Sequence, residues 1–199
     1  MKKFAEFLSL IFNPLFLILI IILLGIEKSA LTQTQTIILT LVAVFLNGFL
    51  PSCIYLYFSK RGIVIDDIVY NKKVLKNRGF LLSRGSIILF FESILIYFLN
   101  KPEPLFLILL SLFILIFLLF VVNVYRKISL HASGITYFSL AILFLFGYQF
   151  WPVLILIPAV LWSRLYLVRH TKKQLFSGFL LASAIIILIF YYFDLIPNF

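Results

Sequence analysis

Charged residues are scarce in this chain. Only 12% of its 199 residues are Asp, Glu, Lys or Arg, whereas 64% are hydrophobic. A soluble globule needs more polar side chains than this to cover its surface, so that class of protein is excluded. Backbone groups in lipid must be satisfied internally, which leaves helices or closed barrels, and the apolar runs here are continuous rather than alternating. The sequence therefore predicts an all-α, polytopic transmembrane helical bundle.

Residues that bind metals or form disulfides are equally rare. The chain has one Cys, two His and seven acidic residues. The single Cys53 can form no intrachain disulfide. One Cys and two His are too few to form a typical zinc-binding site. The sequence also has neither a Gly-rich phosphate-binding loop nor a dinucleotide-binding motif. We expect no metal and no other cofactor.

Long apolar runs are what the chain has in abundance. A helix needs about 20 such residues to cross the hydrocarbon core. No small-residue cleavage site follows the first run, so we expect a retained first helix and not a signal peptide. No repeat or second domain is visible, which predicts one transmembrane domain over residues 1–199. We expect about seven spans (six to seven), near residues 7–25, 35–58, 85–99, 103–123, 131–149, 151–168 and 176–193.

Positive charge is unevenly distributed between the two ends of these spans. One membrane face receives the amino terminus and every second connection between spans. If Arg164 is assigned to that face, it carries 15 of the 17 Lys and Arg, and the opposite face carries Lys28 and Lys101. The positive-inside rule makes the basic face cytoplasmic, in a cell (inner) membrane. Basic residues beside a membrane are an ordinary result of insertion and of anionic headgroups. We therefore expect a bilayer as partner and no nucleic acid; the sequence favours no particular oligomeric state.

Both histidines lie in polar segments on the basic face. His131 lies in KISLHASG and His170 in WSRLYLVRHTKKQLFSG, and a third polar segment, IDDIVYNKKVLKNRGFLLSRG, precedes them. An imidazole is a poor group to expose to lipid, so two at helix ends on one side predict a site. Glu92, inside an apolar run, is either functional or a polar lock to another helix.

These segments resemble the type 2 phosphatidic acid phosphatase superfamily. Its third motif is Ser-Arg, five residues, His, three residues, Asp, and Ser163, Arg164 and His170 match that spacing. Its second motif is Pro-Ser-Gly-His, in which Ser129 and His131 match.

The first motif, Lys and then Arg seven residues on, followed by Pro, is degenerate here. Arg78 is the counterpart of the Arg, Asn71 occupies the strict Lys position, Lys72 is one residue off and Gly79 replaces Pro. The resemblance implies a phosphatase-like core over about residues 65–193.

The resemblance also implies roles for the matching residues. His170 is the nucleophile that attacks phosphorus, and His131 is the acid that protonates the leaving oxygen. Arg164, Arg78, Lys72 and Ser129 bind the phosphoryl oxygens, with Ser163 in support. An imidazole suits both tasks near neutral pH, and guanidinium donors match phosphate oxygens.

One position departs from the family. The Asp that follows the nucleophilic His by four residues is Gln174 here. Its amide oxygen can accept from the ring N–H but brings no negative charge.

The implied function is hydrolysis of a membrane lipid phosphate or diphosphate of the phosphatidate, phosphatidylglycerophosphate or polyprenyl diphosphate class, through a phosphohistidine. Two alternatives stay open: a lipid phosphotransferase on the same scaffold, and a non-catalytic lipid-binding membrane protein.

Overall fold

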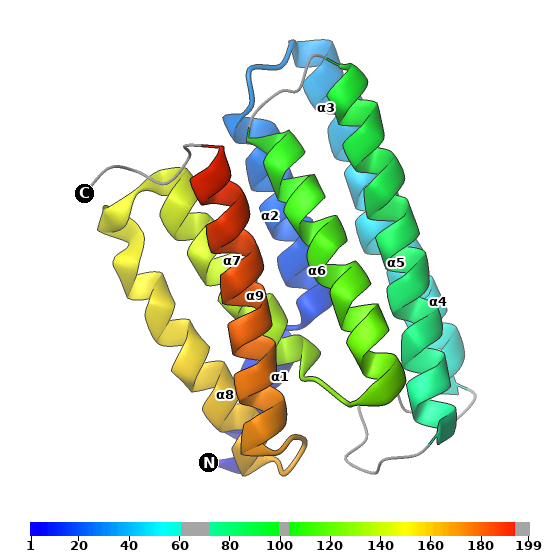
Figure 1. The fold of residues 1–199 in the computed structure, drawn as a ribbon, viewed down its shortest axis with the longest axis vertical. Coiled ribbons are helices and arrows are strands. Elements are labelled where there is room, and N and C mark those ends of the chain that lie inside the picture. Colours follow the sequence, from blue (N-terminus) through cyan, green and yellow to red (C-terminus); the bar gives the residue numbers. More distant parts are fainter. Residues whose placement is uncertain (61–71, 100–103, 194–199) are drawn as a thin grey trace.

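The structure is a computed structural model that describes residues 1–60, 72–99 and 104–193, without the side chains of residues 59 and 72–78. The regular structure in these ranges is helical (Figure 1). The elements are α1 (Lys2–Ile11), α2 (Pro14–Lys28), α3 (Gln33–Ala43), the π-helix η1 (Val44–Phe49), α4 (Leu50–Lys60), α5 (Lys72–Phe98), α6 (Leu105–Tyr125), α7 (Leu130–Phe146), the 3₁₀-helix η2 (Tyr148–Ile155), α8 (Leu156–Tyr166) and α9 (Lys172–Tyr192).

Most of these helices have the length and composition of membrane spans. Within the described ranges, five stretches are long and apolar enough to cross a membrane, and a sixth results if α1 and α2 count as one span. The remaining expected span corresponds to α7, which has 17 residues. The described chain is thus an all-helical bundle with five or six candidate spans.

The first expected span, 7–25, is not one straight helix. The chain breaks between α1 and α2, which meet at an angle of 41°. Pro14 has no N–H to continue a helix, and the Asn13 side chain accepts from the Leu15 N–H (3.0 Å), so α2 starts afresh there. This break releases α1 to lie beside α8.

Two further boundaries differ from the expected spans. The third, expected at 85–99, belongs to α5, which begins at Lys72 inside the expected connection 59–84. Apolar runs do not reveal such a start, because polar residues such as Lys and Arg also form helices well. The sixth, expected at 151–168, is divided into η2 and α8, with Pro152 inside the 3₁₀ segment.

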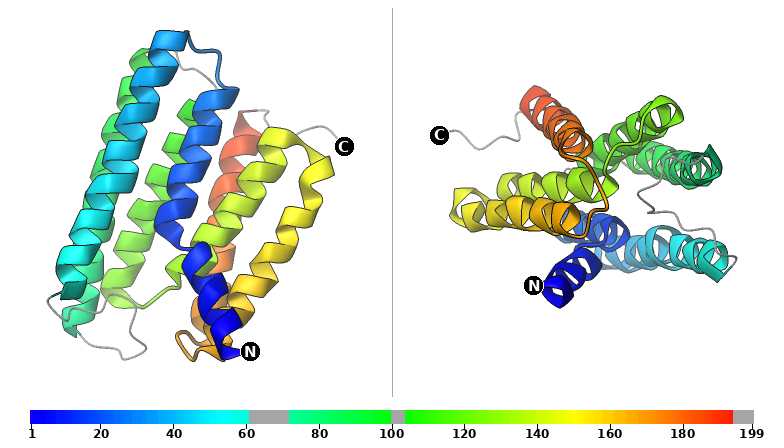
Figure 2. Two further views of the ribbon diagram at one scale, coloured as in Figure 1. Left: turned by 180° about the vertical axis from the view of Figure 1, so that it is seen from behind. Right: turned by 90° about the horizontal axis from the view of Figure 1, so that it is seen from below.

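The core is centred on α6, which packs along α5 and also contacts α2 and α9 (Figure 2). Leu107, Ile108 and Leu112 of α6 are almost fully buried.

Helices α7 and α9 approach closely: a Cβ on Gly178 would lie 2.7 Å from the Ser129 carbonyl oxygen. A residue without a side chain is required there, and it holds the first turns of α7 and α9 together.

Candidate functional site

Ser129 forms the start of α7 and ties it to α9. Its hydroxyl oxygen accepts from the Ala132 N–H (3.3 Å), which satisfies one of the free donors at the helix start. Its own N–H donates to the Gln174 carbonyl oxygen (3.3 Å). Ser129 is fully buried, so this junction lies inside the protein. The second and third motif segments therefore meet at the starts of two helices.

His170 lies just before α9, and its ring is held by Gln174. The Gln174 side-chain oxygen accepts from the Thr171 N–H (3.2 Å), and the Thr171 hydroxyl accepts from the Gln174 N–H (3.3 Å), which is a capping box. The same side-chain oxygen accepts from Nδ1 of His170 (3.1 Å). In the neutral ring the proton is then on Nδ1, and Nε2 carries the lone pair.

The expected contact between His170 and Gln174 is present, but its local structure differs from a helical turn. His170 precedes the cap residue Thr171, so the two side chains meet across the helix start.

A strained turn at the end of α8 directs the chain toward His170. The N–H of Arg169 donates to the Arg164 carbonyl (3.0 Å) and that of Val168 to the Leu165 carbonyl (2.9 Å), the pattern of a Schellman motif. Val168 has φ of 53°, a conformation in which a glycine is the usual residue and a β-branched side chain is strained.

Arg164 and Ser163 are both buried at the end of α8, with different contacts. The Ser163 hydroxyl donates to the Val160 carbonyl (2.7 Å) within its own helix. Arg164 is 3% exposed, and its Nη1 donates to the Ser9 hydroxyl of α1. Ser163 therefore supports its helix, whereas Arg164 is directed out of α8 toward α1.

Ser9 also contacts the second histidine. Nε2 of His131 donates to the Ser9 carbonyl oxygen (3.3 Å). A carbonyl oxygen only accepts, so this contact places a proton on Nε2. Ser9 thus joins Arg164 of α8 and His131 of α7, residues that are 155 and 122 positions away in the chain. Ser9 was not predicted as a site residue, because a single hydroxyl in a largely apolar segment forms no recognisable motif.

Buried positive charge gathers at this end of the bundle. Lys127, two residues before Ser129, is 6% exposed, and it was not singled out from the sequence. Lys127 lies just before α7, whose start carries the positive end of the helix dipole, and Arg164 lies in the last turn of α8. Such an environment favours an anion.

The first motif is described only in part. Lys72 and Arg78 lie in the first two turns of α5, but their side chains lie outside the description, as does Asn71. Arg84, one to two turns after Arg78, is described and lines a cavity that also reaches His131. Arg84 was not expected as a site residue, although it lies in the same polar segment.

Within the described ranges, no group of three or more His, Cys, Asp or Glu side chains is placed to hold a metal ion. The chemistry available at this site is that of imidazole, guanidinium, ammonium, amide and hydroxyl groups.

Comparison of the chain with protein-family models, with curated proteins and with solved structures finds no match, so the geometry of this site and the spacing of its motifs carry the case for a function.

Proposed function

We propose that this protein is a membrane-embedded phosphatase that hydrolyses a lipid phosphate or diphosphate through a phosphohistidine on His170. The observation that carries the proposal is the meeting of the second and third motif segments. The Ser129 N–H contacts the Gln174 backbone, Gln174 holds His170, and Ser9 joins His131 to Arg164.

The first chemical step uses the lone pair on Nε2 of His170. This nitrogen attacks phosphorus while the bond to the leaving oxygen breaks, and His131 in its protonated form gives a proton to that oxygen. Arg164 and Lys127 balance the charge on the phosphoryl oxygens, and the Ser129 hydroxyl hydrogen donates to one of them. The products of this step are the lipid alcohol, or the lipid monophosphate from a diphosphate, and phosphorylated His170.

The second step restores the enzyme. A water molecule attacks phosphorus, neutral His131 takes one of its protons, and the bond between phosphorus and Nε2 breaks. Inorganic phosphate leaves, and His131 is again protonated for the next cycle. Gln174 keeps Nδ1 of His170 protonated throughout, so Nε2 remains the nitrogen that faces phosphorus.

The setting of the site favours a lipid substrate over a soluble one. The site lies where candidate spans begin or end, at the level of lipid headgroups. Counting α7 as a span, we propose seven membrane crossings, and the charge asymmetry then favours a site on the cytoplasmic side of a cell (inner) membrane.

The test is phosphate release by purified protein from a panel of lipid phosphates and diphosphates in detergent micelles. We expect release by the wild type and none by His170→Ala. With a ³²P-labelled substrate, wild-type protein should carry acid-labile phosphate, and His170→Ala should carry none. His131→Ala should be slow, but less so for a substrate with a good leaving group, which needs little protonation.

Three results would redirect the assignment. Equal turnover by the wild type and His170→Ala would rule out His170 as the nucleophile. A phosphorylated acceptor, with less free phosphate than substrate consumed, identifies a phosphotransferase. No turnover across the whole panel, with the lipids still bound, identifies a non-catalytic lipid-binding protein.

A further inference from the structure

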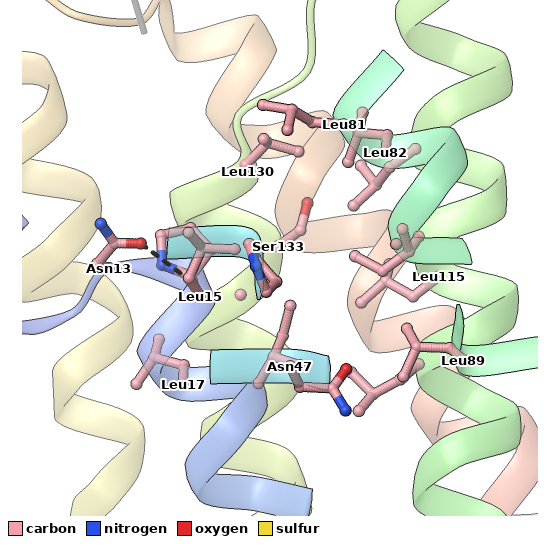
Figure 3. A pocket seen from close by; sticks show the side chains of 18 of the residues that line it. Asn13, Leu15, Leu17, Asn47, Leu81, Leu82, Leu89, Leu115, Leu130 and Ser133 are labelled. Carbon is pink, nitrogen blue, oxygen red and sulfur yellow. Dashed lines mark hydrogen bonds between the residues drawn. The ribbon is translucent and has the colours of Figure 1, made fainter. Parts of the chain in front are cut away.

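A cavity of about 210 Å³ lies next to His131, deeper in the bundle (Figure 3). It is enclosed by five segments: the start of α2, the junction of η1 with α4, and parts of α5, α6 and α7. Most of its lining is aliphatic or aromatic, as with Leu82, Leu115 and Phe138. Predominantly apolar cavities bind apolar molecules; an engineered cavity of about 150 Å³ holds benzene.

The cavity is elongated along the helices. Its lining extends from Leu130 to Phe138 on α7 and from Leu81 to Leu89 on α5. Eight residues of helix correspond to about 12 Å, or somewhat less than half of a hydrocarbon core about 30 Å thick. The space therefore suits a stretch of one extended chain better than a bulky ring system.

Polar groups lie at the two ends of the cavity. His131 and the exposed Arg84 line the end near the candidate site. In Figure 3, Leu81, Leu82 and Leu130 surround one end and Asn47 lies at the other. The Asn47 side-chain N–H group donates to both Glu92 oxygens (2.9 and 3.1 Å), so its amide is engaged by α5. A cationic side chain thus lines the cavity near the candidate site, and a hydrogen-bonded amide lies near its opposite end.

We infer that this cavity binds a hydrocarbon chain of the substrate while the attached phosphate lies at His131 and Arg164. The inference rests on the proposed function and narrows it to phosphate esters whose chain begins directly at the phosphate or diphosphate group. The reason is that His131 connects the cavity to the candidate site. Its ring lines the cavity and bonds to the Ser9 carbonyl oxygen, and the Ser9 hydroxyl accepts from Arg164.

Gly85→Leu tests this inference with a matched control on the same helix. Gly85 lines the cavity, and a Cβ there meets only Ile116 at 3.7 Å, an ordinary contact, so a larger side chain can enter the cavity. Gly79 also lies on α5, its Cβ would meet Phe120 at 3.8 Å, and it does not line the cavity. Both variants gain the same helix propensity, which leaves cavity filling as the difference.

The first measurement is turnover on a series of single-chain alkyl phosphates of increasing length. Wild type and Gly79→Leu should prefer long chains, with kcat/KM rising at least tenfold from the shortest to the longest. Gly85→Leu should lose that rise and keep the turnover of the shortest substrate. Ile88→Trp is a second cavity-filling variant, to be used if Gly85→Leu does not fold. It should also lose the rise of kcat/KM with chain length and keep the turnover of the shortest substrate.

The second measurement does not depend on turnover. A long-chain alkyl phosphate with a diazirine in the chain is photolysed with His170→Ala protein, and the labelled residues are found by mass spectrometry. We expect label on cavity residues such as Leu82 and Leu115, lost in the Gly85→Leu background and kept in the Gly79→Leu background.

The two measurements separate the inference from the proposed function. Turnover that is indifferent to chain length, or label on the outer surface that Gly85→Leu leaves unchanged, overturns the chain site. If the cavity is labelled but the wild-type protein hydrolyses none of the substrates, the chain-binding site is supported and the proposed phosphatase activity is ruled out. A diacyl lipid phosphate should be turned over more slowly than the long single-chain substrates, and turnover at least as fast would overturn the restriction to chains that begin at the phosphate.

Discussion

Two buried polar clusters stand out in an apolar bundle, and they are built differently. One lies at the starts of α7 and α9 and combines Ser129, His131, Arg164 and His170 with Ser9 of α1. The other lies in the middle of the helices and consists of Asn47 on the π-helix η1 and Glu92 on α5.

The two clusters satisfy their polar groups by different means. At helix ends, free backbone donors and carbonyls are already present, so side chains such as Ser129 and Gln174 bond to backbone. In mid-helix the backbone is fully used, and Glu92 relies on a side chain from another helix. A cluster at helix ends can therefore use backbone groups as partners, whereas a pair in the interior links two helices through side chains alone.

The largest effect is expected at the interior pair. Asn47→Leu leaves the Glu92 carboxyl buried without this donor, which should lower the free energy of unfolding by about 3 kcal/mol. Asn47→Leu combined with Glu92→Leu should recover most of that loss, because two apolar side chains then meet. Chemical unfolding in detergent measures both. A double variant as unstable as the single one would mean that Glu92 has a task beyond the lock.

At the helix-end cluster, Ser9→Ala should act through Arg164. The guanidinium loses the acceptor that fixes its direction, and turnover should fall on the order of tenfold, the scale of one hydrogen bond to a charged group. Ser9→Thr should restore turnover because it keeps the hydroxyl. Ser52→Ala is the control, since the Ser52 hydroxyl donates to the Gly48 carbonyl of its own helical stretch (2.7 Å).

A double-mutant cycle separates this role from general packing. In an Arg164→Lys background, Ser9→Ala should have little further effect, because the group that it positions is gone. Faster turnover in Ser9→Ala would contradict positioning and would identify α1 as an obstacle to the substrate.

A smaller effect is expected from Gln174. Gln174→Ala removes the capping box and should cost about 1 kcal/mol of stability. Gln174→Glu keeps the reach to Thr171 and His170 and adds a negative charge at a helix start, worth about 0.5 kcal/mol. Turnover should rise in Gln174→Glu, since a carboxylate supports positive charge on the ring. Slower turnover with unchanged melting would show that this site requires the neutral amide.

The smallest effect is expected at Val168. Val168→Gly relieves the strained φ but adds freedom to the unfolded chain, so the net gain should stay below about 1 kcal/mol. Thermal unfolding followed by tryptophan fluorescence measures it. A loss of stability instead would mean that the valine side chain contributes packing that outweighs the strain.

Much of the helical organisation was predictable from local sequence. Continuous apolar runs predict helices in lipid because no other open structure satisfies the backbone there, and most of the described helices lie where those runs are. Helix starts that depend on polar residues, such as Lys72 for α5, and breaks at prolines were misplaced. Local hydropathy carries little information about either feature.

The site was predictable to a lesser degree. Motif spacing indicated His131, Arg164 and His170 as candidates. The four-residue separation of His170 and Gln174 predicted their contact, which is present across the helix start and not along a helical turn. Ser9 and Lys127 were missed because a single hydroxyl or lysine has no pattern until a distant helix is placed beside it. The side chains of Lys72 and Arg78 lie outside the described part of the chain.

By itself the sequence determined the helical class of the protein and the positions of most apolar helices, because burial in lipid depends on residues a few positions apart. Only the tertiary structure decided that the 41° bend between α1 and α2 places Ser9 between Arg164 and His131. It alone also placed a cavity behind His131 and paired Asn47 with Glu92. These features depend on how separate helices pack, and packing is set by the shapes of all partners together.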